Sequence, residues 1–426
     1  MEINDLYKLY LQYPSVKIDT RKIVNGDIFF ALKGPNFNGN YFAGKALEAG
    51  ASFVVIDEEV NFKDERLIKS DNALLSLQQL AKHHRNQFNI PFIAITGSNG
   101  KTTTKELVHQ VLSSTFKNYT TEGNLNNHIG IPLTILKIKS DAEMAVIEMG
   151  ANHQKEIKDY CSYTLPTHGL ITNCGKAHLE GFGSEEGVRK GKGELFDHLR
   201  ENGGTAFVNN DDSYIKKMSA GIKNIITYGT SEASVTGRAT GTSSFLEVEI
   251  IKGADIKLIR TQLVGKYNLL NVLAAVTIGK HFNIDDEKIK NAIENYTPSN
   301  SRSQLIKKGS NTIILDAYNA NPASMKAAIE NFAQMPGADK NLLIGSMMEL
   351  GKDSKEEHEE IIKIIDGYTW GLVVLVGANF KNIKHTYNHF DNALLAKKWF
   401  NVQQLQNAHI LIKGSRSMQM EKILED

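Results

Sequence analysis

Residues 92–106 read Phe92-Ile93-Ala94-Ile95-Thr96-Gly97-Ser98-Asn99-Gly100-Lys101-Thr102-Thr103-Thr104-Lys105-Glu106. The apolar residues at 92–95 predict a buried strand. After the turn, apolar residues recur at the spacing of one helix face, at Leu107, Val108, Val111 and Leu112. The two glycines therefore lie in a strand-to-helix turn. Free backbone N–H groups and the positive end of the helix dipole favour an anion there, so the turn predicts a phosphate-binding loop.

The polar residues of this turn indicate which kind of phosphate ligand it would bind. Lys101 would add positive charge beside the β- and γ-phosphates of a nucleotide, and the Thr102 hydroxyl would reach Mg²⁺. The general phosphate-loop pattern has a glycine six residues before the lysine, where this chain has Ile95. An ordinary glycine turn with an exposed lysine is the alternative. The strand and helix on either side favour a site for a nucleoside triphosphate.

The composition is that of an ordinary globular protein. Of the 426 residues, 41% are hydrophobic and 23% are charged, and the formal net charge is +1. This balance gives no electrostatic case for binding nucleic acid or an anionic membrane surface. No apolar run approaches the roughly 18 residues of a membrane span. Cys161 and Cys174 are expected as reduced core thiols rather than as a lone disulfide, and the chain as a cytoplasmic enzyme.

The order of apolar runs and turns predicts three domains, at residues 1–88, 89–298 and 299–426. The first has the pattern of a small α/β domain. In the second, strands alternate with helices as in a doubly wound sheet, and the strand-rich segment 215–260 predicts a hairpin sheet at its side. In the third, strands that end in glycine predict a Rossmann-like domain, although no Gly-x-Gly-x-x-Gly motif occurs. The predicted fold class is therefore α/β.

Two polar loops supply candidate substrate contacts. Thr20 and Arg21 lie near the glycine- and asparagine-rich loop 33–40, and an arginine fork there could hold a diphosphate or a uracil ring. A turn with a surface arginine is the alternative, and the residues alone favour it. The loop 121–132 contains the amides of Asn124, Asn126 and Asn127, which could contact phosphate or sugar hydroxyls, or simply form turns.

Two further candidates follow strands of the second domain. Glu148 ends an apolar strand, and a carboxylate at the carboxyl end of a strand in an open α/β sheet lies on the ligand side. Together with Thr102 it is a candidate Mg²⁺ ligand. His178 follows the next strand on the same edge, although a packed or surface histidine remains the alternative. These side chains are therefore expected near the phosphate loop.

Lysines and amides later in this domain extend the candidate site. Lys190 and Lys192 lie beside the expected phosphate site. Asn268 and Asn271 share one face of a helix that the pattern predicts from residue 265 through 275. Each pair is of a type that binds anionic or polar groups.

Together the motifs resemble the Mur ligase family. In chain order they are Thr96 to Glu106, Gly123-Asn124-x-Asn126-Asn127-x-Ile129-Gly130-x-Pro132, Glu148-Met149-Gly150, Asn173-x-Gly175-x-Ala177-His178-Leu179, Lys192-Gly193-Glu194-Leu195-Phe196, Asn268-x-x-Asn271, Asp316-Ala317-Tyr318-Asn319-Ala320-Asn321-Pro322-Ala323-Ser324 and Lys413-Gly414-Ser415-Arg416-x-Met418-x-Met420-Glu421. The resemblance extends from about residue 19 to residue 422 and explains the short glycine spacing.

The resemblance implies a three-domain Mur ligase architecture. A UDP-substrate domain precedes a P-loop ATPase-type domain, and a Rossmann-like domain closes over ATP and brings the amine. The implied cofactors are ATP and Mg²⁺. Because residues 316–324 are closest to the member that adds a dipeptide, the implied substrates are UDP-N-acetylmuramoyl-tripeptide and D-alanyl-D-alanine, joined through an acyl phosphate to make a precursor of peptidoglycan. A monomer is expected.

The resemblance also implies roles for individual residues. The implied catalytic residues are Lys101, Lys192, His178 and Glu148. The implied ATP-binding residues are Gly97, Ser98, Asn99, Gly100, Lys101, Thr102, Thr103, Asn271, Arg302, Asp316 and Asn319. The implied UDP-substrate contacts are Thr20, Arg21, Gly34, Asn36, Gly39, Asn124, Asn126 and Asn127. The implied metal ligands are Thr102, Glu148, His178 and, if carbamylated, Lys192.

Rival functions remain at this point. Another Mur ligase or a folylpolyglutamate-type ligase would share the short ATP loop. The N-terminal domain argues against the folate enzyme, and the chain lacks the Asp-Asn-Pro-Arg segment common in ligases that add the third peptide residue. A nucleotide-switch protein is the rival from another class, but no Asn-Lys-x-Asp segment for reading guanine occurs.

Overall fold

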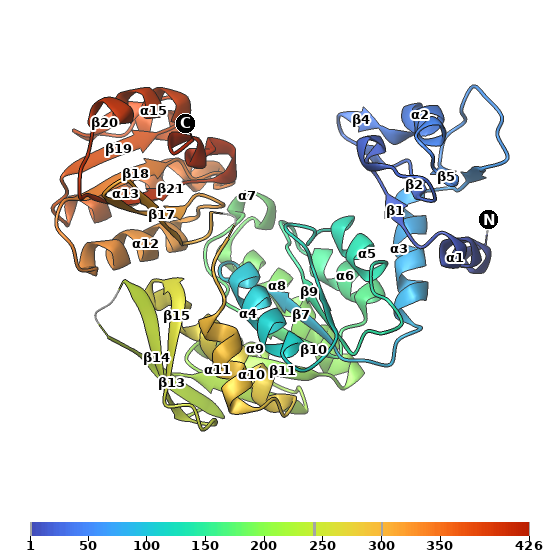
Figure 1. Ribbon diagram of the computed structural model, residues 1–426, viewed down its shortest axis with the longest axis horizontal. Helices are drawn as coiled ribbons and strands as arrows, with labels where there is room; N and C mark the ends of the chain where they lie inside the picture. The colour runs from blue at the N-terminus through green and yellow to red at the C-terminus, as the bar shows by residue number, and fades with distance from the viewer. Residues whose placement is uncertain (1, 242–243, 300, 426) are drawn as a thin grey trace.

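The computed structural model describes residues 2–241, 244–299 and 301–425. Its three larger sheets follow one another along the chain, and Figure 1 shows them as three bodies, with the central one between the other two. We refer to residues 2–85 as the N-terminal part, 92–299 as the central part and 301–425 as the C-terminal part. The α/β class expected from the sequence is confirmed.

The N-terminal part is built on a parallel sheet in the order β1-β2-β5-β6. Helix α2 covers one face with a small apolar core, and helices α1 and α3 lie on the other face. A short antiparallel ribbon, β3–β4, follows β2. The elements are α1 (Ile3–Gln12), β1 (Val16–Lys17), η1 (Thr20–Lys22), β2 (Ile28–Phe30), β3 (Lys33–Gly34), β4 (Phe37–Asn38), η2 (Gly39–Phe42), α2 (Ala43–Glu48), β5 (Phe53–Ile56), β6 (Leu67–Lys69) and α3 (Ala73–Arg85).

The central part contains a nine-stranded sheet in the order β15-β14-β13-β12-β11-β10-β7-β9-β8. All strands from β7 to β13 are parallel to their neighbours among these strands, and β14 and β15 add two antiparallel strands at the β13 edge of the sheet. The elements are β7 (Phe92–Thr96), α4 (Lys101–Ser113), β8 (Asn118–Thr120), α5 (Gly130–Ile135), β9 (Met144–Glu148), α6 (Glu156–Thr164), β10 (His168–Ile171), α7 (Leu179–Phe182), α8 (Glu185–Asn202), β11 (Thr205–Asn209), α9 (Ser213–Met218), β12 (Asn224–Gly229), β13 (Val235–Thr240), β14 (Phe245–Lys252), β15 (Leu258–Val264), η3 (Lys266–Asn268), α10 (Leu269–His281) and α11 (Asp286–Glu294).

Alternation along the strands explains why helices cover both faces of this sheet. On β7, Phe92 and Ala94 join one apolar cluster with α3, α6 and α8, whereas Ile93 and Ile95 join another with α4, α10 and α11. Every residue of β7 is fully buried, as expected of a central parallel strand. The chain passes from β7 to β8 and β9 on one side of β7 and then crosses to β10 on the other side, so the switch point of the sheet lies at the end of β7.

Two details of the sequence prediction were wrong. The strands within 215–260 do not form a separate side sheet, because β12 pairs with β11 and thereby joins them to the central sheet. The helix predicted to end at residue 275 runs to His281, because its apolar side chains continue into the core. The two cysteines are free and buried, as expected.

The C-terminal part contains a six-stranded sheet in the order β16-β17-β21-β18-β19-β20, parallel except for β16. Helices α12 and α13 pack on one face and α15 on the other, as predicted for a Rossmann-like arrangement. The elements are β16 (Gln304–Lys308), β17 (Asn311–Asp316), α12 (Pro322–Gln334), β18 (Lys340–Gly345), η4 (Gly351–Asp353), α13 (Ser354–Asp366), β19 (Leu372–Val376), α14 (Ala378–Lys381), β20 (Asn388–Phe390), α15 (Ala393–Val402), β21 (His409–Lys413), η5 (Arg416–Met418) and η6 (Met420–Ile423).

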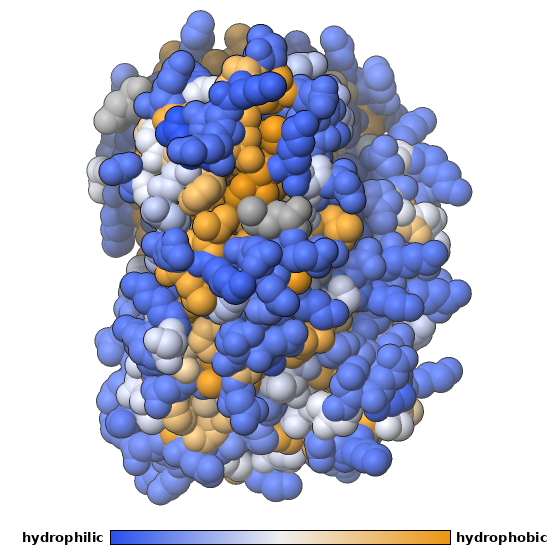
Figure 2. Space-filling model, turned by 90° about the vertical axis from the view of Figure 1, so that its right-hand side faces the viewer, coloured by the Kyte–Doolittle hydropathy of each residue, from blue (hydrophilic) through white to orange (hydrophobic). Residues whose placement is uncertain are grey.

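The surface on the side of the N-terminal part is mainly hydrophilic, with a narrow hydrophobic band in its upper half (Figure 2). Among the residues that the structure describes, no helix combines the length and the apolar character needed to cross a lipid bilayer.

Candidate active site

A cavity of about 940 Å³ lies where the carboxyl ends of β7, β9 and β10 face the C-terminal part. Its lining is rich in amides, hydroxyls and charged side chains. From the central part it includes the phosphate loop from Ser98 to Thr103, Asn124, Asn126, Asn127, Glu148, His178 and Asn271. From the C-terminal part it includes Arg302, Asp316, Tyr318, Asn319, Asn321, Ser324, Glu349 and Lys413. One cavity therefore joins two parts of the chain that are far apart in sequence.

The loop after β7 has the backbone of an anion site. Gly100 caps helix α4 with a φ of +79°, and a Cβ there would lie 2.7 Å from Asn271 Oδ1. The position therefore requires glycine on two grounds, backbone strain and space. Asn173 Oδ1 accepts from the backbone N–H of Asn99 at 3.0 Å and holds the loop against the end of β10.

Lys101 folds back over this loop. Its Nζ donates to the carbonyl oxygens of Gly97 at 2.6 Å and Ser98 at 3.1 Å. Burial lowers the pKa of Lys101, while the negative charge of Glu148 opposes that shift. The ammonium is thus held at the mouth of the loop, where a phosphate would offer it a stronger partner than two carbonyls.

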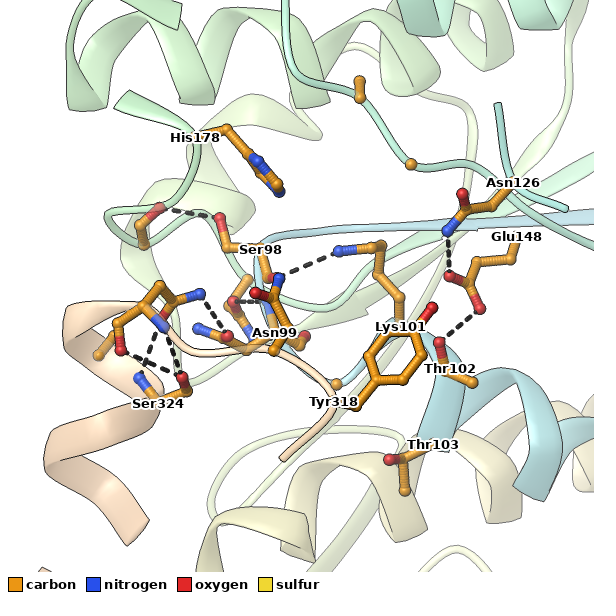
Figure 3. A pocket seen from close by; sticks show the side chains of 18 of the residues that line it. Ser98, Asn99, Lys101, Thr102, Thr103, Asn126, Glu148, His178, Tyr318 and Ser324 are labelled. Carbon is orange, nitrogen blue, oxygen red and sulfur yellow. Dashed lines mark hydrogen bonds between the residues drawn. The ribbon is translucent and has the colours of Figure 1, made fainter. Parts of the chain in front are cut away.

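Glu148 is held between two side chains, as Figure 3 shows. Thr102 Oγ1 donates to Glu148 Oε2 at 2.8 Å, and Asn126 Nδ2 donates to Oε1 at 2.7 Å. A hydroxyl and a carboxylate next to a phosphate loop are oxygen ligands of the kind that Mg²⁺ prefers. The sequence predicted that these two residues share an edge of the sheet, and the structure places them in direct contact.

His178 reaches the cavity from the side opposite Glu148 (Figure 3). Its Nδ1 contacts the carboxylate of Glu349, which belongs to the C-terminal part. A backbone hydrogen bond lies near this contact, because Glu180 N donates to the carbonyl of Glu349 at 3.2 Å. The hydrogen bond from His178 lowers the pKa of the Glu349 carboxyl, against the effect of burial.

Lys192 lies on helix α8 and is fully buried. Its Nζ donates to the carbonyl of Ala151 at 3.0 Å and lies 5.0 Å from the centre of the Phe182 ring. Burial, reinforced by the positive charge of Lys101, lowers the pKa of Lys192 to about 7. A large fraction of this lysine is therefore an uncharged amine at neutral pH, a form that can react with an electrophile. Neither Lys192 nor Lys190, its near neighbour in the sequence, is among the residues that line the cavity.

The metal-binding prediction fits in part. Within the described ranges, no group of three or more His, Cys, Asp and Glu side chains could hold a metal ion. Thr102 and Glu148 provide two oxygen ligands, and phosphate oxygens would complete such a site. A lysine ammonium cannot ligate a cation, and Mg²⁺ prefers oxygen ligands to an amine nitrogen, so His178 and Lys192 fit a second Mg²⁺ only if the amine of Lys192 becomes a carbamate.

The C-terminal part adds a cluster of charged and aromatic groups. Lys413 Nζ donates to Asp316 Oδ2 at 2.6 Å, and the backbone N–H of Ser303 donates to Oδ1 at 3.1 Å. The Arg302 guanidinium stacks on the Tyr318 ring, 3.5 Å from its centre. This arrangement presents one flat aromatic and cationic surface and one fixed carboxylate to the cavity.

Amides link this cluster to the phosphate loop. Asn321 Nδ2 donates to Asn99 Oδ1 at 2.7 Å. Asn271 accepts from Thr104 Oγ1 at 3.0 Å and donates to Asn268 Oδ1 at 2.8 Å. Sequence reasoning assigned no role to Tyr318, Asn321 or Glu349. Only Asn321 carried a recognisable signal, because it precedes a proline and caps helix α12.

The predicted UDP-substrate residues fall into two groups. Asn124, Asn126 and Asn127 line the cavity. The other five, Thr20, Arg21, Gly34, Asn36 and Gly39, lie in the N-terminal part and do not line it. Arg21 is exposed and pairs with Asp19, its neighbour two residues away, at 2.7 Å.

Comparisons with known proteins agree with this architecture. Three family models match the chain: "Mur ligase family, catalytic domain" at residues 12–93, "Mur ligase middle domain" at 95–279 and "Mur ligase, glutamate ligase domain" at 301–416.

Relatives match over nearly the whole chain. A UDP-N-acetylmuramoyl-tripeptide–D-alanyl-D-alanine ligase from Bacillus subtilis is 34% identical over 96% of this chain and 92% of its own length. The enzyme of the same name from Escherichia coli is 35% identical over the same shares.

Solved structures give the same result. The chain resembles a MurF from Acinetobacter baumannii with a TM-score of 0.87 and 28% identity, over 96% of this chain and 92% of that one. It resembles MurF from Thermotoga maritima in complex with ADP with a TM-score of 0.88 and 25% identity, over 97% of each chain. With a phosphate loop, a shared cavity and matches of this extent, the chain belongs to the Mur ligase family.

Proposed function

We propose that this chain is an ATP-dependent ligase that joins D-alanyl-D-alanine to UDP-N-acetylmuramoyl-tripeptide and so forms the pentapeptide precursor of peptidoglycan. The relatives that match 96% of the chain carry the name of this reaction. The observation that carries the proposal is the single cavity, which places a phosphate loop opposite residues of the C-terminal part. A reaction that needs ATP and two further substrates requires such a shared space.

A carboxylate does not react with an amine, because neither of its oxygens is a good leaving group, so it must first be activated. An oxygen of the tripeptide carboxylate attacks the γ-phosphorus of ATP, the bond to the bridging oxygen breaks, and ADP leaves. The product is an acyl phosphate. The amine of D-alanyl-D-alanine then attacks the acyl carbon, phosphate leaves, and the amine proton passes to solvent. Because water also attacks an acyl phosphate, the second step needs a site closed to water.

The residues of the cavity suit these demands. The loop from Gly97 to Thr103 would hold the phosphates through backbone N–H groups, and Lys101 would exchange its two carbonyl partners for phosphate oxygens. Arg302, Asp316, Asn319 and Asn271 would hold the rest of the nucleotide. This assignment is supported by the fact that all four residues line the same cavity as the loop.

We assign Mg²⁺ to Thr102 and Glu148. A divalent cation there would neutralise the phosphates of ATP and polarise them toward attack. The hydroxyl and the carboxylate are already in contact at 2.8 Å, and Asn126 fixes the other carboxylate oxygen. In the reaction, Thr102 and Glu148 would orient their oxygen atoms at the first turn of α4, so that the triphosphate binds in one position.

We assign a carbamate to Lys192. Its uncharged amine would attack carbon dioxide, a nitrogen–carbon bond would form, and the proton would go to solvent. The carbamate would be an anion with two oxygens, in place of a cation. The fully buried amine with a pKa lowered to about 7 supports this assignment. Together with His178 it would then suit a second cation.

The remaining assignments concern the UDP-linked substrate and the organisation of the chain. The residues that would hold its uridine diphosphate end in the N-terminal part are Thr20, Arg21, Gly34, Asn36 and Gly39, and those that would contact the rest of it are Asn124, Asn126 and Asn127. The functional domains would be residues 1–88, 89–298 and 299–426. We propose a monomer that works in the cytoplasm, where ATP is available.

The decisive experiment measures phosphate release from ATP with UDP-N-acetylmuramoyl-tripeptide, with and without D-alanyl-D-alanine, while mass spectrometry follows the product. We expect release to need both substrates and the product to contain the dipeptide. Turnover with a single amino acid would move the chain to another step of the family. Nucleotide binding with no dependence on either substrate would leave only a switch protein and end the proposal.

A further inference from the structure

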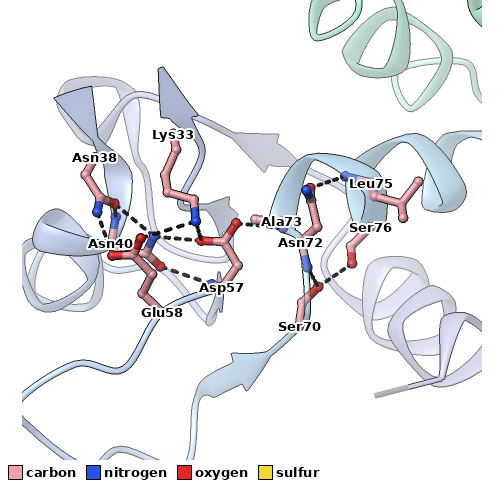
Figure 4. A network of polar contacts seen from close by, with 10 residues as sticks. All are labelled: Lys33, Asn38, Asn40, Asp57, Glu58, Ser70, Asn72, Ala73, Leu75 and Ser76. Carbon is pink, nitrogen blue, oxygen red and sulfur yellow. Dashed lines mark hydrogen bonds and ion pairs between the residues drawn. The ribbon is translucent and has the colours of Figure 1, made fainter. Parts of the chain in front are cut away.

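A polar network in the N-terminal part ties the loop after β4 to helix α3, and Figure 4 shows it as one connected cluster. Its centre is Asp57, which follows β5 and whose side chain is only 4% exposed. Asp57 Oδ1 accepts from Asn40 Nδ2 at 2.8 Å, and the backbone N–H of Asp57 donates to Asn40 Oδ1 at 3.1 Å. Both polar ends of the Asn40 amide are therefore used by one residue.

The second carboxylate oxygen connects to the helix. Asp57 Oδ2 accepts from the backbone N–H of Ala73 at 3.2 Å, in the first turn of α3. A carboxylate at a helix N-terminus is favoured by the unpaired N–H groups and the helix dipole. Burial raises the pKa of Asp57, but the hydrogen bonds from Asn40 and Ala73 and the charge of Lys33 outweigh burial, and the pKa is lowered overall. Asp57 is therefore charged at neutral pH.

The loop itself is fixed from the other side. Asn38 Oδ1 accepts from Asn40 N at 3.0 Å, and Asn38 Nδ2 donates to Glu58 Oε2 at 2.6 Å. Gly39 lies between them so close to the preceding strand that a Cβ would be 2.5 Å from the carbonyl oxygen of Leu32. These contacts leave the loop at residues 38–40 one conformation, and Asp57 sets its position relative to α3.

Helix α3 in turn is attached to the central part. Arg85 Nε donates to the carbonyl of Thr164 at 2.9 Å, and its Nη2 to that of Leu165 at 3.0 Å. Nearer to the cavity, Gln78 Nε2 donates to the carbonyl of His128 at 3.1 Å, and His128 lines the cavity. The loop at 38–40 is thus connected, through Asp57 and α3, to a wall of the candidate active site.

We propose that Asp57 is a positioning residue for the UDP-linked substrate: it holds the loop at 38–40 in register with α3, and thereby sets the distance between the site of the uridine diphosphate end and the cavity where the peptide end reacts. This inference rests on the proposed function, which assigns the loop to the UDP substrate. A substrate that spans two parts of a chain binds well only if both ends meet prearranged partners.

The test compares Asp57→Ala with the wild type for each substrate separately. We expect the KM for UDP-N-acetylmuramoyl-tripeptide to rise about tenfold, while kcat and the KM values for ATP and D-alanyl-D-alanine stay within about twofold. Asn40→Ala should have the same effect. The double variant should have no higher KM than either single variant, because both changes remove the same contact between Asn40 and Asp57. In Asp57→Asn, one oxygen remains to accept from either Asn40 Nδ2 or Ala73 N, so the rise in KM for UDP-N-acetylmuramoyl-tripeptide should be smaller than in Asp57→Ala.

Asp64→Ala is the matched control. Asp64 lies in the same part of the chain and pairs with Arg66 at 2.6 Å, outside the network. It should leave all three KM values unchanged. Melting temperatures of all variants show whether Asp57 only stabilises the fold: a lower melting temperature with an equal loss for all three substrates would overturn the inference.

Binding of UDP alone, measured by titration calorimetry, separates this inference from the proposed function. If the wild type turns over UDP-N-acetylmuramoyl-tripeptide but Asp57→Ala leaves the KM for it unchanged, the positioning role is wrong and the ligase stands. If the wild type shows no turnover but binds UDP, and Asp57→Ala weakens that binding, the positioning role stands and the ligase proposal fails. If the wild type shows no turnover and binds no UDP, both fail.

Discussion

His178 and Glu349 meet across the cavity, and each has a positive backbone φ, of 51° and 62°. Non-glycine residues rarely adopt this region, because each costs of order 1 kcal/mol or more and persists only where the surroundings hold it there. One residue belongs to the central part and the other to the C-terminal part. Two strained positions that touch at a candidate active site indicate a contact kept for function rather than for stability.

Glu349→Gly tests this interpretation. Glycine relieves the strain at φ 62° and removes the carboxylate that contacts His178. We expect stability to stay equal or to rise by up to about 1 kcal/mol, while kcat falls about tenfold. Chemical denaturation and steady-state kinetics measure the two effects. Glu232→Gly is the control, since Glu232 is exposed, has a φ of 47° and is not among the residues that line the cavity, and it should change stability alone. A Glu349→Gly enzyme with full activity would contradict the functional reading.

Gly100→Ala should impair nucleotide use. A methyl group there meets Asn271 Oδ1 at 2.7 Å in a backbone that alanine tolerates poorly, so the loop must change shape. We expect kcat/KM for ATP to fall about 100-fold. Gly203→Ala is the matched control: its φ is +70°, but nothing lies within 4 Å of the added Cβ. It should lose about 1 kcal/mol of stability and keep its KM for ATP.

Glu148→Gln should weaken the response to Mg²⁺. The amide keeps the volume of the side chain but removes the charge that a divalent cation requires. We expect kcat to fall by about 100-fold or more and the Mg²⁺ concentration for half-maximal activity to rise. A magnesium titration of activity measures both. Glu143→Gln should behave as the wild type, because Glu143 lies just before β9 and its carboxylate accepts from Lys117 N at 2.7 Å. An unchanged magnesium midpoint in Glu148→Gln would remove Glu148 from the metal site.

Lys192 should give the free energy of unfolding a specific pH dependence in carbon-dioxide-free buffer. Its pKa is about 7 in the folded chain and about 10.5 in the unfolded one. Between these values the unfolded chain binds one more proton, so stability rises with pH from about 7 to about 10.5 and this contribution is flat below 7. The difference between the wild type and Lys192→Met, followed by denaturation at each pH, should change by at most about 1.4 kcal/mol per pH unit.

The carbamate gives this lysine a second, independent readout. Removing carbon dioxide should lower the activity of the wild type, and bicarbonate should restore it. Lys192→Met should have low activity that bicarbonate does not change. A wild type that is indifferent to bicarbonate would exclude the carbamate, although it would leave the pH dependence of stability intact.

An ion pair between the central and C-terminal parts should affect turnover. Lys176 Nζ lies 2.5 Å from Glu357 Oε1, and the Glu357 side chain is only 11% exposed. We expect Lys176→Glu to lower kcat about threefold to tenfold, and the exchange Lys176→Glu/Glu357→Lys to recover most of it. The same exchange at Lys355 and Glu359, which pair within helix α13, should have no effect. Failure of the exchanged pair to recover activity would show that closure does not depend on this contact.

The sequence was sufficient to predict the structural elements whose residue patterns are local. The phosphate loop, its strand and its helix could be read directly, because buried strand, glycine turn and amphipathic helix each leave a signal within a few residues. Contact between Thr102 and Glu148 could be anticipated from the rule that parallel strands end at one edge. The functional roles of these and the other candidate residues remain predictions.

Contacts made by tertiary packing left no such signal. The segment 215–260 was strand-like, but only the pairing of β12 with β11 shows which sheet it joins. Asn99 and Asn321 are separated by 222 positions in sequence, so their contact could not be inferred from spacing. Glu349 was missed because its importance comes from the histidine that it meets and from its backbone conformation, neither of which a single glutamate in a loop reveals.

The two outer parts are attached to the central part in different ways. Apolar side chains of α1 and α3, among them Leu6, Leu77 and Leu80, share one core with the central sheet. Contacts to the C-terminal part among the described residues are mainly polar, with Val264 and Phe245 as apolar exceptions. Apolar cores separate only by unfolding, whereas polar contacts can exchange with water. Stepwise unfolding should therefore release the C-terminal part first, and a fragment lacking α3 should aggregate rather than fold.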